Sequence, residues 1–450
     1  MQFTKALQHT IVWKALNTLL TFCINLLLVR IMGAEYSGMF FYAIAILTFF
    51  TLVISWSIES GITYYGSNEP INILSLSIAI LPLLLLQVII SWLLLNLIET
   101  PIDKNLCWLF VISNLTIVYF SALYYAQKKF LSLNLVVCGV NILVVVMLCY
   151  LFFRPHHIAN DEVTNKLLIL TWRNIFDNYP GKVYSSFYWA PFIYFSGFLL
   201  QGIILMIVFF SKPGLIIFPI KIPLILIKQV LAYSSVALIS NILFFLVTRV
   251  DYYFVQKYCD EVALSNYVQV SKLGQLLILL PSMMAAVIFP FSSGKDDADY
   301  LDKLKLLCRV ITLLFIPAAL VIIIGGYWLF PWLFGPGFNF MYAAFLWYLS
   351  GFYSLSIVTL LAAYLAGKAM INSNMKASLA ALVVVITGDI LLIPVWGIYA
   401  AAAVSSAAYI ACLVYLLWVY KIKLGVKFAD FLVFKSGDFK TLFSKLSINI

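Results

Sequence analysis

Charged side chains inside long apolar runs are the residues of this sequence that could do chemistry. Lys14, Glu59 and Lys272 each lie in a stretch that is otherwise apolar enough to cross a bilayer. A charge at bilayer depth costs from about 2.5 kcal/mol upward, so such residues usually face a partner, a cavity or water. Cations there can hold phosphate groups, and a carboxylate can take up and release an ion. We therefore predict that these residues line a water-filled cavity.

Neutral polar side chains accompany these charges at helical spacing. On the first run, the polar side chains fall within an arc of about 100° at 3.6 residues per turn, because they follow the i, i+3, i+4, i+7 pattern. The alternative is that such stripes only join helices to one another. The candidate cavity residues are Lys14, Asn17, Thr21, Asn25, Asn241, Gln269 and Lys272. Glu59 is the candidate site for a coupling ion.

Other kinds of site have little support. The seven cysteines form no CxxC pair and the three histidines lack ligand spacing, so we expect no metal, no cofactor and no disulfide framework. No nucleotide-binding P-loop occurs. Asp389 stands alone near the outer end of its predicted helix, where a solvated helix-end residue and a site are both open readings.

The composition of the chain indicates that the elements that position these residues lie in a membrane. Hydrophobic residues make up 64% of the chain, charged residues only 10%, and the mean hydropathy is +1.04. A soluble domain carries roughly 25% charged residues. The net charge of +10 is spread through short gaps between apolar runs, which favours membrane lipid headgroups over nucleic acid as the partner.

Apolar runs of about 20 residues predict membrane-spanning helices, and the fold class expected is all-α integral membrane with about twelve of them. They cover 11–31, 39–64, 73–96, 105–126, 131–153, 191–211, 230–249, 262–289, 305–329, 340–366, 378–395 and 398–420.

Longer gaps between the runs divide the chain. Residues 1–211 form a predicted N-terminal six-helix lobe that includes an outer loop at 154–190 with a short surface helix. Residues 212–229 form a Pro-rich linker, 230–420 a C-terminal six-helix lobe, and 421–450 a basic amphipathic cytoplasmic tail. An even number of crossings places both termini on one side. Most of the 28 Lys and Arg residues, including those of the tail, then lie inside, so we expect cytoplasmic termini.

The end of the first run carries a motif. The stretch Leu28-Val-Arg30-Ile-Met-Gly33-Ala-Glu35-Tyr36-Ser-Gly38-Met-Phe40 resembles the opening signature of the polysaccharide and O-antigen flippases. Glu59-Ser-Gly61-Ile62 resembles the acidic residue and glycine that follow in many members. Arg249, Asp251 and Tyr267 resemble the counterpart in the second half, although a glycine of the family pattern is missing there. The signature residues are Arg30, Gly33, Tyr36, Gly38, Arg249, Asp251 and Tyr267.

The resemblance implies a MATE-like fold of the multidrug, oligosaccharidyl-lipid and polysaccharide exporter superfamily, with two six-helix lobes around a central cavity. It implies a transporter and not an enzyme, located in the bacterial cell inner membrane. The substrate implied is a polyprenyl-diphosphate-linked oligosaccharide for O-antigen, capsule or exopolysaccharide, flipped by alternating access. Proton or sodium coupling and other polysaccharide assembly proteins are further expected partners. A drug or metabolite exporter of the same superfamily and a membrane polysaccharide polymerase remain the alternatives.

Overall fold

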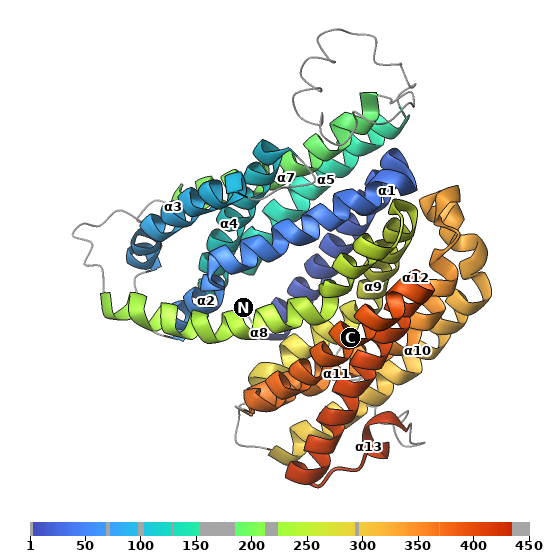
Figure 1. Cartoon of the computed structure of the whole chain (residues 1–450). Coiled ribbons are helices and arrows are strands. Elements are labelled where there is room, and N and C mark those ends of the chain that lie inside the picture. Colours follow the sequence, from blue (N-terminus) through green and yellow to red (C-terminus); the bar gives the residue numbers. More distant parts are fainter. Residues whose placement is uncertain are drawn as a thin grey trace. The chain divides into compact units, whose positions relative to one another are not determined.

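The computed structural model describes residues 3–68, 73–97, 103–127, 129–153, 185–211, 224–292, 297–368 and 370–433. Every regular element in this part of the chain is a helix (Figure 1). The helices are α1 (Phe3–Ser55), α2 (Ile58–Asn68), α3 (Ile73–Leu97), α4 (Lys104–Ala126), α5 (Phe130–Phe153), α7 (Ser185–Phe210), α8 (Leu224–Tyr258), α9 (Glu261–Ser292), α10 (Asp297–Phe334), the 3-10 helix η1 (Pro336–Phe338), α11 (Met341–Gly367), α12 (Ile371–Leu424) and α13 (Ala429–Leu432).

Two glycines break the longest helices. Gly33 in α1 has φ 74° and ψ 176°, and Gly397 in α12 has φ 60° and ψ −140°. Glycine enters this region because it has no Cβ. Helix α12 therefore contains two of the predicted runs, and α1 contains the first run and most of the second, which ends in α2. Ten described helices are long and apolar enough to span a membrane, and together with α2 they contain all twelve runs, so the predicted all-α membrane fold is confirmed.

The chain forms two compact units, residues 1–242 and 243–450. In unit 1, α1 packs against α5, α4 packs against α2, α3 and α7, and α5 also packs against α7. In unit 2, α11 packs between α9 and α12 and also contacts α10, and α13 packs against α10. The boundary falls inside α8, so one continuous helix begins in unit 1 and ends in unit 2.

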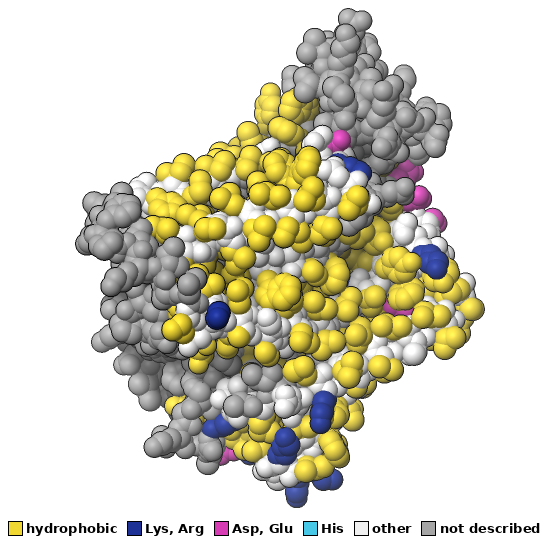
Figure 2. Space-filling model, turned by 60° about the vertical axis from the view of Figure 1, so that its left-hand side comes forward, with side chains coloured by type: hydrophobic (Ala, Val, Ile, Leu, Met, Phe, Trp, Pro, Cys, Tyr) yellow, Lys and Arg dark blue, Asp and Glu magenta, His cyan; other side chains and the backbone are white. Residues whose placement is uncertain are grey.

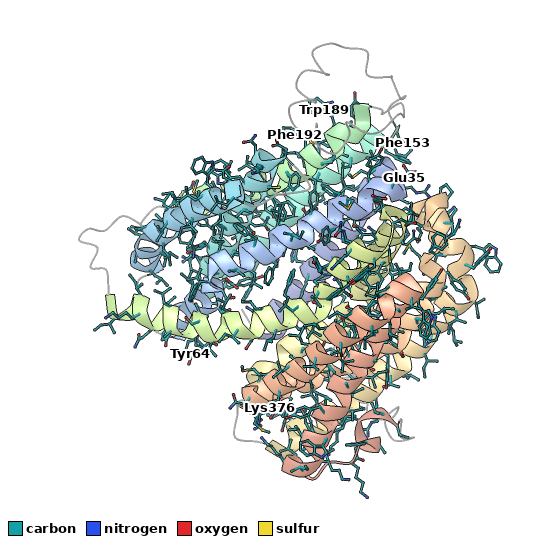
Figure 3. All side chains as sticks on the ribbon, in the orientation of Figure 1. Glu35, Tyr64, Phe153, Trp189, Phe192 and Lys376 are labelled. Atoms are coloured by element: carbon teal, nitrogen blue, oxygen red, sulfur yellow. The ribbon has the colours of Figure 1, made fainter. Side chains whose placement is uncertain are left out.

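The described surface is mostly apolar. Figure 2 shows hydrophobic side chains over most of the described face that it presents, and residues such as Leu97 and Trp332 are 82% and 71% exposed. In Figure 3, Trp189 and Phe192 lie at one end of unit 1 and Tyr64 lies toward the other. Exposed aromatic residues are typical of membrane–water interfaces. The chain is a multi-pass membrane protein.

The linker and tail differ in detail from their predicted form. Helix α8 begins at Leu224, six residues before the predicted run, so the end of the predicted linker is helical. The rest of the linker and most of the 154–190 loop, including its predicted surface helix, lie outside the described residues. Helix α12 continues to Leu424, and the described part of the tail beyond it contains only the short α13.

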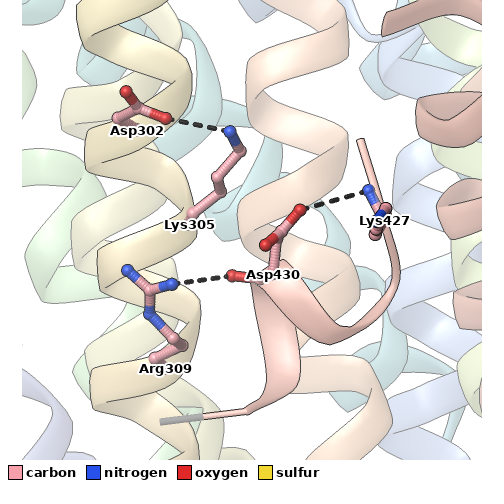
Figure 4. Close-up of polar contacts among 5 residues, drawn as sticks. All are labelled: Asp302, Lys305, Arg309, Lys427 and Asp430. Atoms are coloured by element: carbon pink, nitrogen blue, oxygen red, sulfur yellow. Dashed lines mark hydrogen bonds and ion pairs between the residues drawn. The ribbon is translucent and has the colours of Figure 1, made fainter. Parts of the chain in front are cut away.

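Helix α13 is fastened to unit 2 by buried and polar contacts. Phe431 is fully buried and packs edge-on against Tyr420 at 5.1 Å. The Arg309 guanidinium donates to the backbone carbonyl of Asp430 at 3.1 Å, and the backbone N–H of Lys427 donates to the Asp430 carboxylate at 3.3 Å (Figure 4). This part of the tail therefore packs on protein through Phe431, whereas Phe428 and Val433 remain exposed.

Candidate functional site

A buried carboxylate forms the centre of unit 2. Asp251 on α8 is fully buried. Its Oδ2 accepts hydrogen bonds from the Tyr267 hydroxyl on α9 and from the Ser405 hydroxyl on α12, the latter at 3.2 Å. Its Oδ1 accepts from the backbone N–H of Tyr252 at 2.9 Å. Three donors from three helices thus replace the water that a carboxylate loses on burial.

Arg249 lies two residues before this carboxylate on α8 and compensates part of its charge. Its guanidinium donates to the Tyr252 hydroxyl and, at 3.0 Å, to the Ser271 hydroxyl on α9. The guanidinium carbon lies 4.9 Å from the centre of the Tyr252 ring, a cation–π distance. Arg249 and Asp251, which the sequence identified only as a signature, therefore belong to one network.

Stacked tyrosines extend the network toward α11. The Tyr267 and Tyr348 rings stack at 6.1 Å, and the Tyr348 and Tyr409 rings stack at the same distance. The Tyr348 and Tyr409 hydroxyls lie 3.3 Å apart. All three side chains are buried. Such rings fix the spacing of α9, α11 and α12 while their hydroxyls supply polar groups.

A second carboxylate lies close to the first. Asp389 on α12 is fully buried, and neither carboxylate oxygen makes a hydrogen bond with the described residues. It lies near enough to interact electrostatically with Asp251. The reading of Asp389 as a solvated helix-end residue is therefore wrong. The reason is the kink at Gly397, which folds the chain so that the two halves of α12 pack together.

Gly388 makes this packing possible. A Cβ at this position would lie 2.6 Å from Val404 Cγ1, closer than atoms of neighbouring side chains can approach. Asp389 follows Gly388 in sequence, and Ser405 follows Val404. The close approach of these two segments therefore brings Asp389 to the same part of unit 2 as Ser405 and its acceptor Asp251.

Two of the predicted cavity residues lie on α9, which also carries Tyr267 and Ser271 of this network. Gln269 is fully buried and Lys272 is half-buried. Lys272 follows Ser271, the acceptor of Arg249, and its charge interacts with that guanidinium. Unit 2 thus brings the predicted Lys272 close to Arg249, while the predicted Gln269 is buried on the same helix.

Unit 1 holds a different polar site, formed by α1, α5 and α7. The Asn141 side-chain amide donates to the Asn17 side-chain oxygen at 2.7 Å. A cavity of about 180 Å³ opens beside this pair. Its lining residues are Asn17, Thr21, Ile24, Val137, Asn141, Val144, Tyr194, Gly197, Phe198 and Gln201. Of the predicted α1 residues, Asn17 and Thr21 line the cavity, Asn25 is buried farther along α1, and Lys14 is exposed.

The signature at the end of the first run surrounds the kink of α1. Arg30 and Glu35 are exposed on either side of Gly33, whereas Tyr36 is half-buried and Gly38 is buried. The positive φ of Gly33 explains why this position of the signature is a glycine. Arg30 is therefore more exposed than its second-half counterpart Arg249, which is half-buried.

The joint between α1 and α2 is held by α8. Trp56 and Ser57 have φ of 56° and 48°, a strained region for residues with side chains. The Trp56 ring N–H donates to the Ser235 hydroxyl at 2.8 Å, and the Asn241 amide donates to the Ser57 hydroxyl at 3.1 Å. The predicted Asn241 thus acts within unit 1 as a support of this joint.

Glu59 lies directly after the joint. It is half-buried, its Oε2 makes no hydrogen bond with the described residues, and it interacts electrostatically with Tyr119 on α4. A Cβ on Gly61 would lie 2.6 Å from both Ser234 Oγ and the backbone oxygen of Val230 on α8. The glycine of the Glu59-Ser-Gly61 motif is therefore required for the close contact of α2 with α8.

Sequence reasoning missed several residues of both sites. In unit 1 these are Asn141, Tyr194 and Gln201, and in unit 2 they are Ser271, Tyr348, Ser405 and Tyr409. A side-chain amide in an apolar run, such as Asn141 or Gln201, was a usable signal. Among the described residues, no group of three or more His, Cys, Asp or Glu could hold a metal ion.

Comparison with known proteins gives one family match and several structures of similar fold. A family described as "Polysaccharide biosynthesis protein" matches residues 188–343. A search of curated proteins by sequence found no match. Among solved structures, lipid II flippase MurJ in an inward closed conformation is similar with a TM-score of 0.65 and 16% identity, over 100% of this chain and 93% of that chain.

Two further structures show the same fold. An inward-facing multidrug resistance MATE family transporter of the MOP superfamily has a TM-score of 0.62 and 11% identity, over 92% of this chain and 98% of that one. A MOP superfamily transporter from Pyrococcus furiosus has a TM-score of 0.58 and 12% identity, over 94% and 96%. The chain thus has the fold of MurJ and the MATE transporters, and its match to the polysaccharide biosynthesis family over residues 188–343 confirms the resemblance seen in its signatures.

Proposed function

We propose that this protein flips a polyprenyl-diphosphate-linked oligosaccharide across the bacterial inner membrane by alternating access, with both termini in the cytoplasm. The observation that carries the proposal is the match to a polysaccharide biosynthesis family within a chain whose whole length resembles a lipid II flippase. Surface polysaccharide such as O-antigen, capsule or exopolysaccharide would be the product, made together with other polysaccharide assembly proteins.

The polar residues fit the parts of such a substrate. Lys14 and Lys272 are cations in otherwise apolar helices and suit the diphosphate. Side-chain amides and hydroxyls such as Asn17 and Thr21 suit the sugars, because a sugar hydroxyl both donates and accepts hydrogen bonds. The apolar outer surface suits a polyprenyl tail that stays in lipid.

The test is complementation of a deletion strain, with surface polysaccharide as the readout. We expect Lys14→Ala and Lys272→Ala each to reduce surface glycan severalfold, the double variant to reduce it most, and Arg substitutions to retain more activity than Ala because the charge survives. Lys421→Ala, which removes an exposed lysine at the end of α12, is the matched control. Normal surface glycan from a fully inserted double variant would contradict the proposed role of the lysines.

Ion coupling forms the second part of the proposal. Asp251 and Asp389 are two buried carboxylates within electrostatic range, and one of them lacks hydrogen bonds from the described residues. Two carboxylates that approach each other in a dry environment favour a shared proton or a monovalent cation, because both cannot stay charged and uncompensated. Glu59 in unit 1 remains the other candidate carboxylate.

Transport in proteoliposomes under an imposed proton or sodium gradient separates the two carboxylate sites. If Asp389 couples transport, Asp389→Asn abolishes the response to the gradient while substrate exchange without a gradient continues. Glu59→Gln then leaves the gradient response intact. The reverse pattern assigns coupling to Glu59, and an unchanged gradient response in both variants excludes coupling at either residue.

The substrate assay also distinguishes the alternatives. A drug or metabolite exporter would restore drug tolerance in a sensitive strain and leave surface glycan absent. A polymerase would change glycan chain length without changing the side of the membrane on which the lipid-linked unit accumulates. We expect loss of this protein to leave complete lipid-linked units on the cytoplasmic side.

A further inference from the structure

The cavity of unit 1 is built differently from the charged network of unit 2. Its polar lining consists of three amides, one threonine and one tyrosine, and none of its ten lining residues is charged. The remaining lining is aliphatic or aromatic. Small-molecule sites usually have this composition, with few placed polar groups on an apolar wall.

The amides have hydrogen-bonding capacity beyond the bond that joins them. Each side-chain amide offers two N–H donors and an acceptor oxygen, and the bond from Asn141 to Asn17 uses one donor and one acceptor position. The Gln201 amide lies 3.5 Å from the Val137 carbonyl, at the limit of a hydrogen bond. The Thr21 hydroxyl donates to the Asn17 carbonyl at 2.8 Å, which leaves its oxygen available as an acceptor.

Size limits what can enter. The cavity volume of about 180 Å³ is below the range of roughly 300–1,000 Å³ that drug-sized ligands occupy. Gly197 helps to set this volume, because a Cβ there would lie 2.6 Å from Val144 Cγ2 across the α5–α7 contact. Tyr194 and Phe198 pack edge to face at 5.0 Å and form an aromatic wall. The space suits one pyranose ring and excludes a disaccharide.

A cation lies next to the cavity on the same helix. Lys14 precedes Asn17 by three residues, a rise of about 4.5 Å along the helix axis, and its side chain is exposed. In a glycosyl diphosphate lipid, the first sugar is bonded directly to the phosphate. A diphosphate held at Lys14 would therefore bring that sugar to the amides.

We propose that this cavity binds the first, phosphate-linked sugar of the substrate and selects an uncharged one. The inference rests on the proposed function and adds a specificity site to it. Hydroxyl and amide groups of a neutral sugar find partners in the amides, and its apolar ring face packs on the aromatic wall. A uronic acid would bring a carboxylate into a cavity whose lining supplies no cation, and burial of an unpaired charge is strongly unfavourable.

The experiment measures binding of the purified full chain to three short probes. They are farnesyl diphosphate, its glucosyl derivative and its glucuronosyl derivative. We expect the glucosyl probe to bind about tenfold more tightly than the glucuronosyl probe. Asn141→Leu and Gln201→Met, which keep approximate size and remove amides, should reduce this preference to about twofold or less.

Matched controls separate binding from folding. Asn114→Leu removes an amide of α4 that bonds to the Phe110 carbonyl of its own helix and does not line the cavity, so it should keep the tenfold preference. Unchanged affinity of Asn141→Leu for bare farnesyl diphosphate shows that this variant is folded. If Asn141→Leu loses affinity for farnesyl diphosphate, the test uses Gln201→Met, provided that this variant keeps that affinity. Thr21→Val is used if both amide variants lose it.

The outcomes are distinct. Equal affinity of the parent protein for the glucosyl and glucuronosyl probes overturns the inference. A preference for the glucosyl probe that the amide variants retain also overturns it. Neither result contradicts the flippase proposal. Failure of the parent protein to bind any of the three probes overturns both. Loss of the preference in the amide variants, with the control unchanged, supports the cavity as the sugar site.

Discussion

The two units use opposite polar chemistry. In unit 2, the Asp251 and Asp389 carboxylates are fully buried, and the Asp251 carboxylate has donors from three helices. In unit 1, neutral amides line an open cavity and the nearby Lys14 is exposed. A buried charge network has few alternative arrangements, because every displaced partner leaves an unpaired group. An amide cavity tolerates exchange of partners. This contrast underlies the two proposals made above, which assign ion coupling to the carboxylates of unit 2 and sugar recognition to the amides of unit 1.

The strongest test of this contrast compares loss of one polar residue in each unit. Asp251→Ala leaves Arg249 without its nearby carboxylate and removes the acceptor of Tyr267 and Ser405, so it should lower the free energy of unfolding by about 3–5 kcal/mol. Asn17→Ala removes the hydrogen bond from the Asn141 amide and should lower the free energy of unfolding by about 1 kcal/mol. Thermal unfolding of the purified protein in detergent measures both. Equal losses would break the comparison.

A glycine pair tests whether unit 2 depends on close helix packing. Gly388→Ala places a methyl group 2.6 Å from Val404 Cγ1, and overpacking of this kind costs about 1–3 kcal/mol. We expect reduced stability and a weaker gradient response in proteoliposomes. Gly139→Ala in α5 is the control, since a Cβ added at Gly139 would have no atom of a neighbouring helix within 4 Å. A Gly388→Ala protein as stable and active as the control would refute the packing argument.

Adjacent serines of α12 sharpen the comparison within unit 2. Ser405 donates to the Asp251 carboxylate, whereas Ser406 donates to the Trp347 backbone carbonyl at 2.8 Å. Hydrogen bonds to charged groups contribute about 1.5–3 kcal/mol, against about 1 kcal/mol for neutral pairs. Ser405→Ala should therefore lose more stability and more transport than Ser406→Ala. The same two assays apply, and a larger loss for Ser406→Ala would contradict the assignment.

The smallest effect is expected at the surface of unit 2. Lys305 and Asp302 form an ion pair at 2.9 Å, with the Asp302 side chain 74% exposed. Exposed pairs contribute about 0.2–1 kcal/mol, so Lys305→Ala should barely change the unfolding temperature. A loss that approached that of Asp251→Ala would mean that charge itself, and not burial, distinguishes the network.

Much of the architecture follows from sequence, because apolar runs of membrane length leave few alternatives to helices. The signature glycine Gly33 marks a helix kink, and the α1 stripe correctly placed Asn17 and Thr21 on one face. The environment of Asp389 could not be predicted. Its burial depends on the fold of α12 at Gly397, which joins residues that a linear pattern places at a helix end.

The missed residues have a common physical cause. Asn141 follows Asn134 by seven residues in α5, and Gln201 is the one side-chain amide of α7, but only contact between α1, α5 and α7 gives Asn141 and Gln201 a shared cavity. Ser405 and Tyr348 belong to residue types that are frequent in membrane helices. Their role depends on a carboxylate more than 90 positions away in sequence, a relation that only the packed unit establishes.

The boundary inside α8 has a consequence for recombination among relatives. The first part of α8 follows the predicted linker in sequence, yet Ser235 and Asn241 support the joint at Trp56 and Ser57 in unit 1. A crossover in the linker would therefore join one parent's α2 to the other parent's α8. Chimeras should fold only when both parents share the polar partners of that joint, or when the crossover falls after Ile242. The predicted N-terminal lobe ends at residue 211, whereas the compact unit that a crossover must keep intact ends at residue 242.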